Sequence, residues 1–252
     1  MVLSMSAMFF TYAWASTSER LAVAAAITVC FALLALALRG VSRSGAWAGG
    51  VACFALFANA GPGAFAILGA LFAATWASTR LGYRRKQELG VAERREGRSA
   101  SQVLANLGVA SGAALFFGAT GNRAWLVIVA ATLAEAATDT VASEVGQSVG
   151  RDAWMITSGT RVPAGTDGGI TFLGTIAGLA AGLAIALVAV GCRIVGWREI
   201  WIPVVAGFVG MLADSVMGGT IQRRGWISNQ GVNFVATMIA AATGYGILMA
   251  AK

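Results

Sequence analysis

The sequence predicts an all-α protein, a polytopic bundle of about eight transmembrane helices within a range of six to eight. The first observation is composition: of 252 residues, 58% are hydrophobic and only 12% are charged, against about 25% charged in an ordinary soluble domain. A soluble chain of this length would need more polar surface to cover its core. The second observation is that long apolar stretches alternate with short polar segments, which predicts one integral membrane domain over residues 1–252.

Eight stretches approach the roughly 20 apolar residues that a helix needs to cross a bilayer. They are residues 20–39, 44–60, 63–79, 101–119, 124–142, 169–191, 200–219 and 231–250. The second and third are short, and Gly61-Pro62-Gly63 between them predicts a tight turn. The apolar residues before the first stretch lack a basic start, which argues against a cleaved signal peptide.

Basic residues predict which ends of the spans face the cytoplasm. The loop at 80–100 holds seven of the 18 Lys and Arg residues, and such loops favour the cytoplasmic side. Threading eight spans from this loop places 40–43, 143–168 and 220–230 on the same, cytoplasmic side. Thirteen of the 18 basic residues then lie on the cytoplasmic side, and both termini lie outside. The net charge of +7 therefore follows a membrane pattern, and no nucleic-acid partner is predicted.

Two residue types limit the chemistry. The chain has no histidine, which excludes histidine general bases and histidine metal ligands. Its three cysteines form no CxxC pair, so neither a disulfide framework nor a zinc site is indicated. Any metal must be held by carboxylates and neutral oxygens, which favours Mg²⁺, with Mn²⁺ as the alternative.

The first polar cluster lies at the end of the fifth span. Glu135, Asp139 and Ser143 follow one another at four-residue spacing, as do Thr140 and Glu144, which places them on neighbouring helical faces. Carboxylates buried together would repel one another, and a divalent cation would relieve this repulsion. The alternative is an amphipathic helix end in water, which explains Glu144 better than the deeper Glu135.

The second cluster is the Gly- and Thr-rich segment before the sixth span. Thr166, Asp167, Gly168 and Gly169 offer hydroxyls, backbone N–H groups and turns, which suit an anion-binding concavity beside a helix N-terminus. Arg161 adds a full positive charge. The alternative is a plain turn in which Asp167 caps the helix.

The third cluster spans the last connection. Asp214 lies inside an apolar run on the same helical face as Gln222, and Asn229 and Asn233 repeat the four-residue spacing on the next helix. Polar groups at such positions are usually functional, although hydrogen bonding between helices is the alternative.

A weaker feature and a packing motif complete the pattern. Arg98 ends the basic loop and precedes Asn106 on the fourth span, where a phosphate clamp and an ordinary solvated loop are both compatible with the residues. The GxxxGxxxG run of Gly174, Gly178 and Gly182 predicts close helix packing. Acidic ligands, an anion cradle and arginines together indicate a site that handles nucleotide phosphates beside lipid.

The order of these motifs resembles a known family. Residues 139–144 form DTxxSE, residues 165–169 form GTDGG, residues 214–222 form DSxxGxxxQ, and a late Asn-Phe follows at 233–234. Together with the segment from Arg98 to Asn106, they are similar to the plant phytyl-phosphate kinases of tocopherol synthesis and their prokaryotic relatives. The resemblance covers residues 40–245.

This resemblance implies transfer of the γ-phosphoryl group of CTP to a prenyl monophosphate, giving a prenyl diphosphate and CDP. It implies CTP as co-substrate and leaves a homo-oligomer open. No plastid transit peptide like that of the plant members is evident, so we expect a prokaryotic plasma (inner) membrane, and the basic loops predict a site that faces the cytoplasm. With this activity we expect Mg²⁺ on Asp139, Glu144 and Asp214, and phosphoryl oxygens on Arg98 and Arg161. The predicted nucleotide and acceptor contacts are Asn106, Thr140, Ser143, Thr166, Asp167, Gly168, Gly169, Gln222, Asn229 and Asn233.

Two other functions fit the same residues. A CTP-using lipid cytidylyltransferase would share the nucleotide and the metal but release pyrophosphate. A cation-coupled membrane transporter would also use buried carboxylates, although the motifs gather at one predicted face and no inverted repeat is evident.

Overall fold

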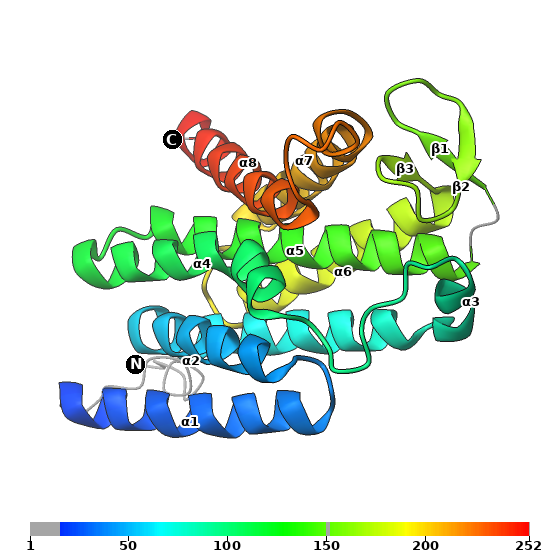
Figure 1. Ribbon diagram of the computed structural model, residues 1–252. Helices are drawn as coiled ribbons and strands as arrows, with labels where there is room; N and C mark the ends of the chain where they lie inside the picture. The colour runs from blue at the N-terminus through cyan, green and yellow to red at the C-terminus, as the bar shows by residue number, and fades with distance from the viewer. Residues whose placement is uncertain (1–15, 150–151, 252) are drawn as a thin grey trace.

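The computed structural model describes residues 16–149 and 152–251, and the predicted all-α class is confirmed there (Figure 1). Seven of the described helices are long and apolar enough to cross a membrane. The helices are α1 Thr17–Ala37, α2 Arg43–Arg80, α3 Tyr83–Glu88, α4 Ala100–Thr120, α5 Ala124–Val149, α6 Phe172–Gly191, α7 Trp201–Met217 and α8 Asn229–Ala250, with short turns η2 Trp197–Glu199 and η3 Gly218–Gln222. The expectation about a signal peptide falls on residues 1–15, which lie outside the described residues.

Helix α2 doubles back on itself and forms an antiparallel hairpin. Its backbone leaves the helical conformation at Gly61 (φ 80°, ψ −176°), directly before Pro62. The indole N–H of Trp76, near the end of α2, donates to the carbonyl of Leu38, which precedes the start of α2 (3.1 Å). A straight helix from Arg43 to Trp76 would be about 50 Å long and would keep these groups far apart. The predicted turn is thus confirmed, and the two halves of α2 correspond to the two short stretches predicted on either side of it.

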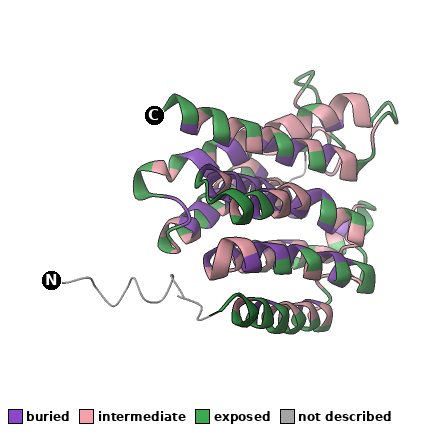
Figure 2. Ribbon diagram, turned by 90° about the vertical axis from the view of Figure 1, so that its left-hand side faces the viewer, coloured by how far each residue is buried: buried purple, intermediate pink, exposed green. Residues whose placement is uncertain are grey.

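Helix α5 is the centre of the bundle. Of the 18 residues in its most apolar stretch, 89% are buried, against 11% in the corresponding stretch of α1. Figure 2 shows buried residues in the middle of the bundle and a mostly exposed α1. The predicted close packing is confirmed between α5 and α6. A Cβ added at Gly178 would lie 2.5 Å from the carbonyl oxygen of Thr138, and one at Gly182 would lie 2.4 Å from the hydroxyl of the same residue.

The four connections predicted to share one side of the membrane meet at one end of the bundle, which we call the loop end. The N–H of Ser42 donates to the carbonyl of Arg98 (3.0 Å), and Gly168 packs directly on Gly219. In Figure 1 the strands and α3 lie at the right, while the start of α1 and the end of α8 lie at the left. The polar motifs are therefore brought to one end of the molecule.

Two segments predicted as loops carry regular structure. Helix α5 continues seven residues past the predicted end at 142, because the polar side chains of its last turns face a cavity instead of lipid. The strands β1 Asp152–Met155, β2 Arg161–Pro163 and β3 Gly169–Ile170 form an antiparallel sheet in the order β2-β1-β3. The basic loop contains α3.

Candidate functional site

A polar cavity of about 400 Å³ opens at the loop end, between α4, α5, α7, α8 and the loops that precede α4 and α6. Fourteen of the fifteen predicted site residues line this cavity, so residues far apart in the sequence come together. They are Arg98, Asn106, Asp139, Thr140, Ser143, Glu144, Thr166, Asp167, Gly168, Gly169, Asp214, Gln222, Asn229 and Asn233. Their position agrees with a shared site, and their chemical roles stay predictions.

Carboxyl groups from two helices and a loop gather in the cavity. They include Asp139 on α5, Asp214 on α7 and Asp167 in the Gly- and Thr-rich loop. Arg94 and Arg98 line the same cavity. With its amide oriented to suit its neighbours, Asn233 donates to Oδ2 of Asp214 (3.1 Å) and to a backbone carbonyl (3.0 Å). The cavity thus combines carboxylate and amide oxygens with two arginines.

These oxygens fit Mg²⁺ only as part of a larger ligand set. Among the residues that the structure describes, no three His, Cys, Asp or Glu side chains form a complete metal site. Mg²⁺ is usually held by one or two carboxylates together with waters and substrate phosphates, and Asp139 and Asp214 match that requirement. The deeper Glu135 is 1% exposed, and its Oε2 has no hydrogen-bond partner. It lies behind the cavity instead of lining it.

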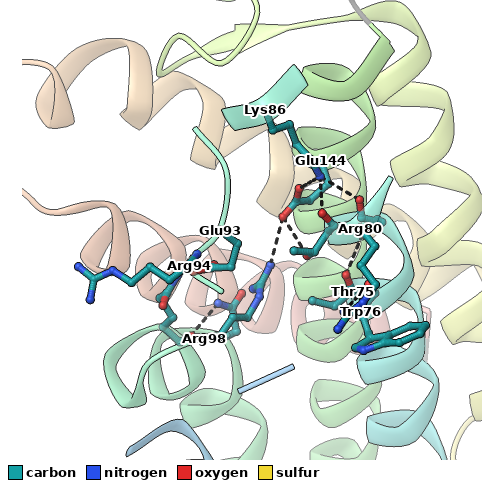
Figure 3. Close-up of polar contacts among 12 residues, drawn as sticks. Thr75, Trp76, Arg80, Lys86, Glu93, Arg94, Arg98 and Glu144 are labelled. Atoms are coloured by element: carbon teal, nitrogen blue, oxygen red, sulfur yellow. Dashed lines mark hydrogen bonds and ion pairs between the residues drawn. The ribbon is translucent and has the colours of Figure 1, made fainter. Parts of the chain in front are cut away.

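Glu144 is engaged by the protein itself (Figure 3). Its Oε2 lies 2.5 Å from Nζ of Lys86, and its Oε1 accepts a hydrogen bond from the hydroxyl of Thr79 (2.9 Å). Arg98 lies 4.0 Å from the same Oε1. Lys86 is fully buried and also donates to the carbonyls of Ser78 (3.1 Å) and Thr79 (2.7 Å). Glu144 therefore joins the basic loop to α5 at the edge of the cavity.

Sequence reasoning missed Lys86, which it counted among the solvated charges of the basic loop. The chain has only two lysines, Lys86 and Lys252, beside sixteen arginines. The residue type gives no signal of burial, because an ammonium is strongly hydrated and arginine is the usual residue of buried ion pairs. The partner of Lys86, Glu144, is 58 positions away, so no local pattern reveals the pair.

The Gly- and Thr-rich loop is held against α7 by the close approach of two glycines. Gly168 has a positive φ of 79°, and a Cβ there would lie 2.4 Å from the Cα and N atoms of Gly219. The N–H of Gly169 donates to the carbonyl of Thr166 (2.8 Å), and the Thr166 hydroxyl donates to the carbonyl of Pro163 (2.7 Å). Because the Gly169 N–H is used within the loop, it is not available as the phosphate donor that the sequence predicted.

Helix α7 ends in a π-helical turn, η3, directly beside this loop. Such turns are frequent at functional sites. Asp214, Gly218 and Gln222 all line the cavity, as their common helical face predicted. The Gln222 amide lies 3.5 Å from Oδ1 of Asn229 and links the turn to α8.

Arg161 is the predicted site residue that the structure does not bring to the cavity. It lies on β2 with an exposed side chain, 4.0 Å from Asp152 and over the ring of Trp154 (5.0 Å). Strand pairing places Arg161 opposite Trp154, and these two neighbours hold its guanidinium outside the cavity. A phosphate clamp at Arg161 therefore has no support from its position.

The fold and the cavity define a polytopic helical membrane protein with a polar, acidic site at the loop end. The chain belongs to the integral membrane protein family DUF92, whose family model matches residues 26–241. That range includes every residue of the cavity.

Curated relatives come from cyanobacteria, plants and archaea. An uncharacterised membrane protein of Synechocystis is 33% identical over 207 residues, which cover 80% of this chain and 79% of that protein. The protein VTE6, chloroplastic, of Arabidopsis thaliana is 28% identical over 214 residues, and this chain spans 63% of its length. An uncharacterised membrane protein of Methanocaldococcus jannaschii is 36% identical over 114 residues, 45% of this chain and 47% of that protein. No solved structure matches the chain. These matches confirm the resemblance to the phytyl-phosphate kinase family.

Proposed function

We propose that the chain is a CTP-dependent kinase that transfers a phosphoryl group to a prenyl monophosphate and forms the prenyl diphosphate. The observation that carries the proposal is the polar cavity itself, which Asp139, Asp214 and Asn233 line together with Arg98 and the Gly- and Thr-rich loop. The match to the Arabidopsis protein supports the same function. The membrane proposed is a prokaryotic plasma membrane, and the basic residues of the loop end support a cavity that faces the cytoplasm.

The nucleotide would lie in the polar cavity with its phosphates near the two aspartates. Asp139 and Asp214 would hold Mg²⁺ together with phosphate oxygens, and Mn²⁺ is the alternative ion. When bound, the ion would neutralise charge on the transferred phosphoryl group. Asp167 would contact the ribose, the base or the metal, and Gln222 and Asn229 would order the base or the acceptor phosphate. Glu144, predicted as a third metal ligand, is already paired with Lys86, and we propose that it positions the loop.

Catalysis would need little proton transfer. A phosphate monoester is largely dianionic near neutral pH because its second pKa is near 6. It can attack the γ-phosphorus directly: the new bond joins an acceptor oxygen to phosphorus, and the bond to the β-γ bridging oxygen breaks, which releases CDP. The protein must therefore hold two anions in line and neutralise their charge. Arg98, which lines the same cavity as Asp139, would neutralise part of the charge on the acceptor phosphate.

A lipid cytidylyltransferase would use the same cavity, and only the products separate the two reactions. A cytidylyltransferase releases pyrophosphate, whereas the kinase releases CDP. A transporter would require the carboxylates to lie along a path across the bundle. Asp139 and Asp214 instead line a cavity at the loop end, which supports an enzyme.

The first test is transfer of label from γ-labelled CTP to a panel of prenyl monophosphates by the purified protein with Mg²⁺. We expect labelled prenyl diphosphate from the parent protein and none from Asp139→Asn. Asp152→Asn is the matched control, because Asp152 is exposed on β1 and does not line the cavity. ATP and a reaction without acceptor run alongside.

The outcomes separate the candidate functions. Equal transfer by Asp139→Asn and Asp152→Asn would remove Asp139 from the site. Labelled pyrophosphate with a CDP-lipid product would replace the kinase with a cytidylyltransferase. No transfer to any acceptor, and no protection by CTP against heating, would refute a nucleotide-using enzyme.

A further inference from the structure

A second cavity, of about 300 Å³, lies between α1, α2, α4 and α5. We call it the apolar groove. Its inner part is lined by large apolar side chains, and the proposed reaction uses none of them. These side chains are Phe31, Leu68, Leu71, Phe72, Val103 and Leu107.

One face of the second half of α2 forms the long wall of the apolar groove. Its lining residues follow helical spacing from Leu68 to Thr79 and Arg80, as residues on one helical face do. The eleven steps from Leu68 to Thr79 give the wall a length of roughly 16 Å along the helix axis. The groove is thus long and apolar, and its dimensions suit one extended hydrocarbon chain.

The opposite wall of the apolar groove is α1, a helix that other segments of the protein bury only slightly. Only 11% of its apolar window is buried, and it packs chiefly against α2. In a membrane the outer faces of α1 would contact lipid, because its exposed side chains are apolar, as at Val29 and Leu33. A lipid chain therefore has a short lateral path from the bilayer into the groove.

The end of the apolar groove nearest the loop end is strongly basic. Five arginines line it, and Glu93 is the one carboxylate among its described lining residues. The arginines are Arg39, Arg80, Arg94, Arg95 and Arg98. A groove that is apolar inside and basic at its mouth matches a molecule with one apolar chain and an anionic head.

The mouth of the groove is held in place by specific contacts. The guanidinium of Arg80 lies over the ring of Trp76 (4.1 Å) and donates to the carbonyl of Leu38. The Trp76 indole N–H donates to the same carbonyl (3.1 Å). Gln102 donates to the carboxylate of Glu93 (2.8 Å), which ties the basic loop to α4.

The apolar groove and the polar cavity share one wall. Six residues line both, so the basic mouth of one opens beside the aspartates of the other. The shared residues are Glu93, Arg94, Arg98, Gln102, Asn106 and Thr140. A molecule lying in the groove would present its head to a nucleotide in the polar cavity.

We infer that the apolar groove binds the isoprenoid chain of the acceptor, and that Arg98 and Thr140 at the shared wall receive the acceptor phosphate. The inference rests on the proposed function and adds where the lipid binds and from which side it arrives. The volume lies at the lower end of small-molecule sites and suits one chain, not the paired chains of a phospholipid. The chain would reach the groove laterally, past α1.

Photo-crosslinking tests the position of the chain without relying on catalysis. The probe is a long-chain prenyl monophosphate with a diazirine at the tail end, added to the detergent-purified protein without nucleotide. We expect crosslinked peptides from α1, the second half of α2 and α4, and competition by unlabelled prenyl monophosphate but not by phosphatidic acid. Crosslinks confined to the outer faces of α6 or α8, or full competition by phosphatidic acid, would overturn the inference.

A substitution that fills the groove tests its use in the reaction. Gly49 lines the groove, and a Cβ there would lie 3.8 Å from Val103, an ordinary contact that the fold can accept. Gly112→Leu is the matched control, because a Cβ at Gly112, on α4, meets nothing and the residue lines neither cavity. We expect Gly49→Leu to displace about two methylene groups of a long chain from the groove, which would raise the KM for a geranylgeranyl monophosphate roughly tenfold. The KM for the short dimethylallyl monophosphate should change by less than about twofold.

The two experiments distinguish a failure of the groove from a failure of the proposed function. Crosslinks in the groove without any transfer from CTP would retain the lipid site and refute the kinase. Transfer with crosslinks elsewhere would retain the kinase and refute the groove. Equal KM changes for long and short acceptors in Gly49→Leu would also refute the groove.

Discussion

The buried ion pair between Lys86 and Glu144 gives the sharpest test of how the loop end is assembled. We consider Lys86→Met, which keeps most of the side-chain volume and removes the ammonium. Lys86 is fully buried and its Nζ donates to Glu144 and to two carbonyls. Removing one partner of a buried pair costs about 3–5 kcal/mol. Glu144 keeps the Thr79 hydroxyl and a nearby guanidinium, so we expect a loss of about 3 kcal/mol.

The loss should be local, because α3 is only six residues long and Lys86 attaches it to α5. A change of about 3 kcal/mol is roughly a hundredfold in the opening equilibrium. Hydrogen exchange followed by mass spectrometry should show about that increase for the amides of residues 83–91, while amides in the middle of α5 stay protected. Arg84→Met is the matched control, because it removes a charge from the same helix at an exposed position.

A double variant completes the cycle. Replacing both partners by apolar residues of similar size is often close to neutral, so Lys86→Met with Glu144→Met should cost less than the sum of the single changes. Additive effects, or equal exchange in Lys86→Met and Arg84→Met, would refute the coupling. If Glu144 were instead a metal ligand, Glu144→Gln alone would change the Mg²⁺ dependence of activity, and Lys86→Met would not.

Three further predictions follow from single contacts. Gly168→Ala should reduce CTP binding at least about tenfold, since a positive φ and a backbone contact oppose the Cβ; unchanged protection by CTP against heating would contradict this. Gly178→Leu should prevent folding because α5 backbone lies against that glycine, whereas Gly191→Leu, where a Cβ meets nothing, should fold normally in size-exclusion chromatography. Asn233→Leu removes the donor to Asp214 and should raise the Mg²⁺ concentration needed for half-maximal transfer about 10–100-fold. An unchanged Mg²⁺ titration would exclude that role for Asn233.

The membrane spans and most of the candidate site could be predicted from the sequence because each depends on local signals. Apolar runs of sufficient length identify helices in lipid, and Gly61 with Pro62 marks the reversal in α2. Polar side chains within such runs have few places to lie except a shared cavity. That constraint brings Asp139, Asp214 and Asn233 together although the sequence separates them.

Only the tertiary structure decided which charged side chains pair with each other and how the short strands pair. Lys86 reaches Glu144 across 58 positions, and β1 directs Arg161 away from the cavity by pairing with β2. Neither arrangement has a local pattern, because each depends on which surface another segment happens to cover. The apolar groove is likewise an outcome of how α1, α2, α4 and α5 pack, since its apolar lining residues are indistinguishable in the sequence from those of an ordinary membrane span.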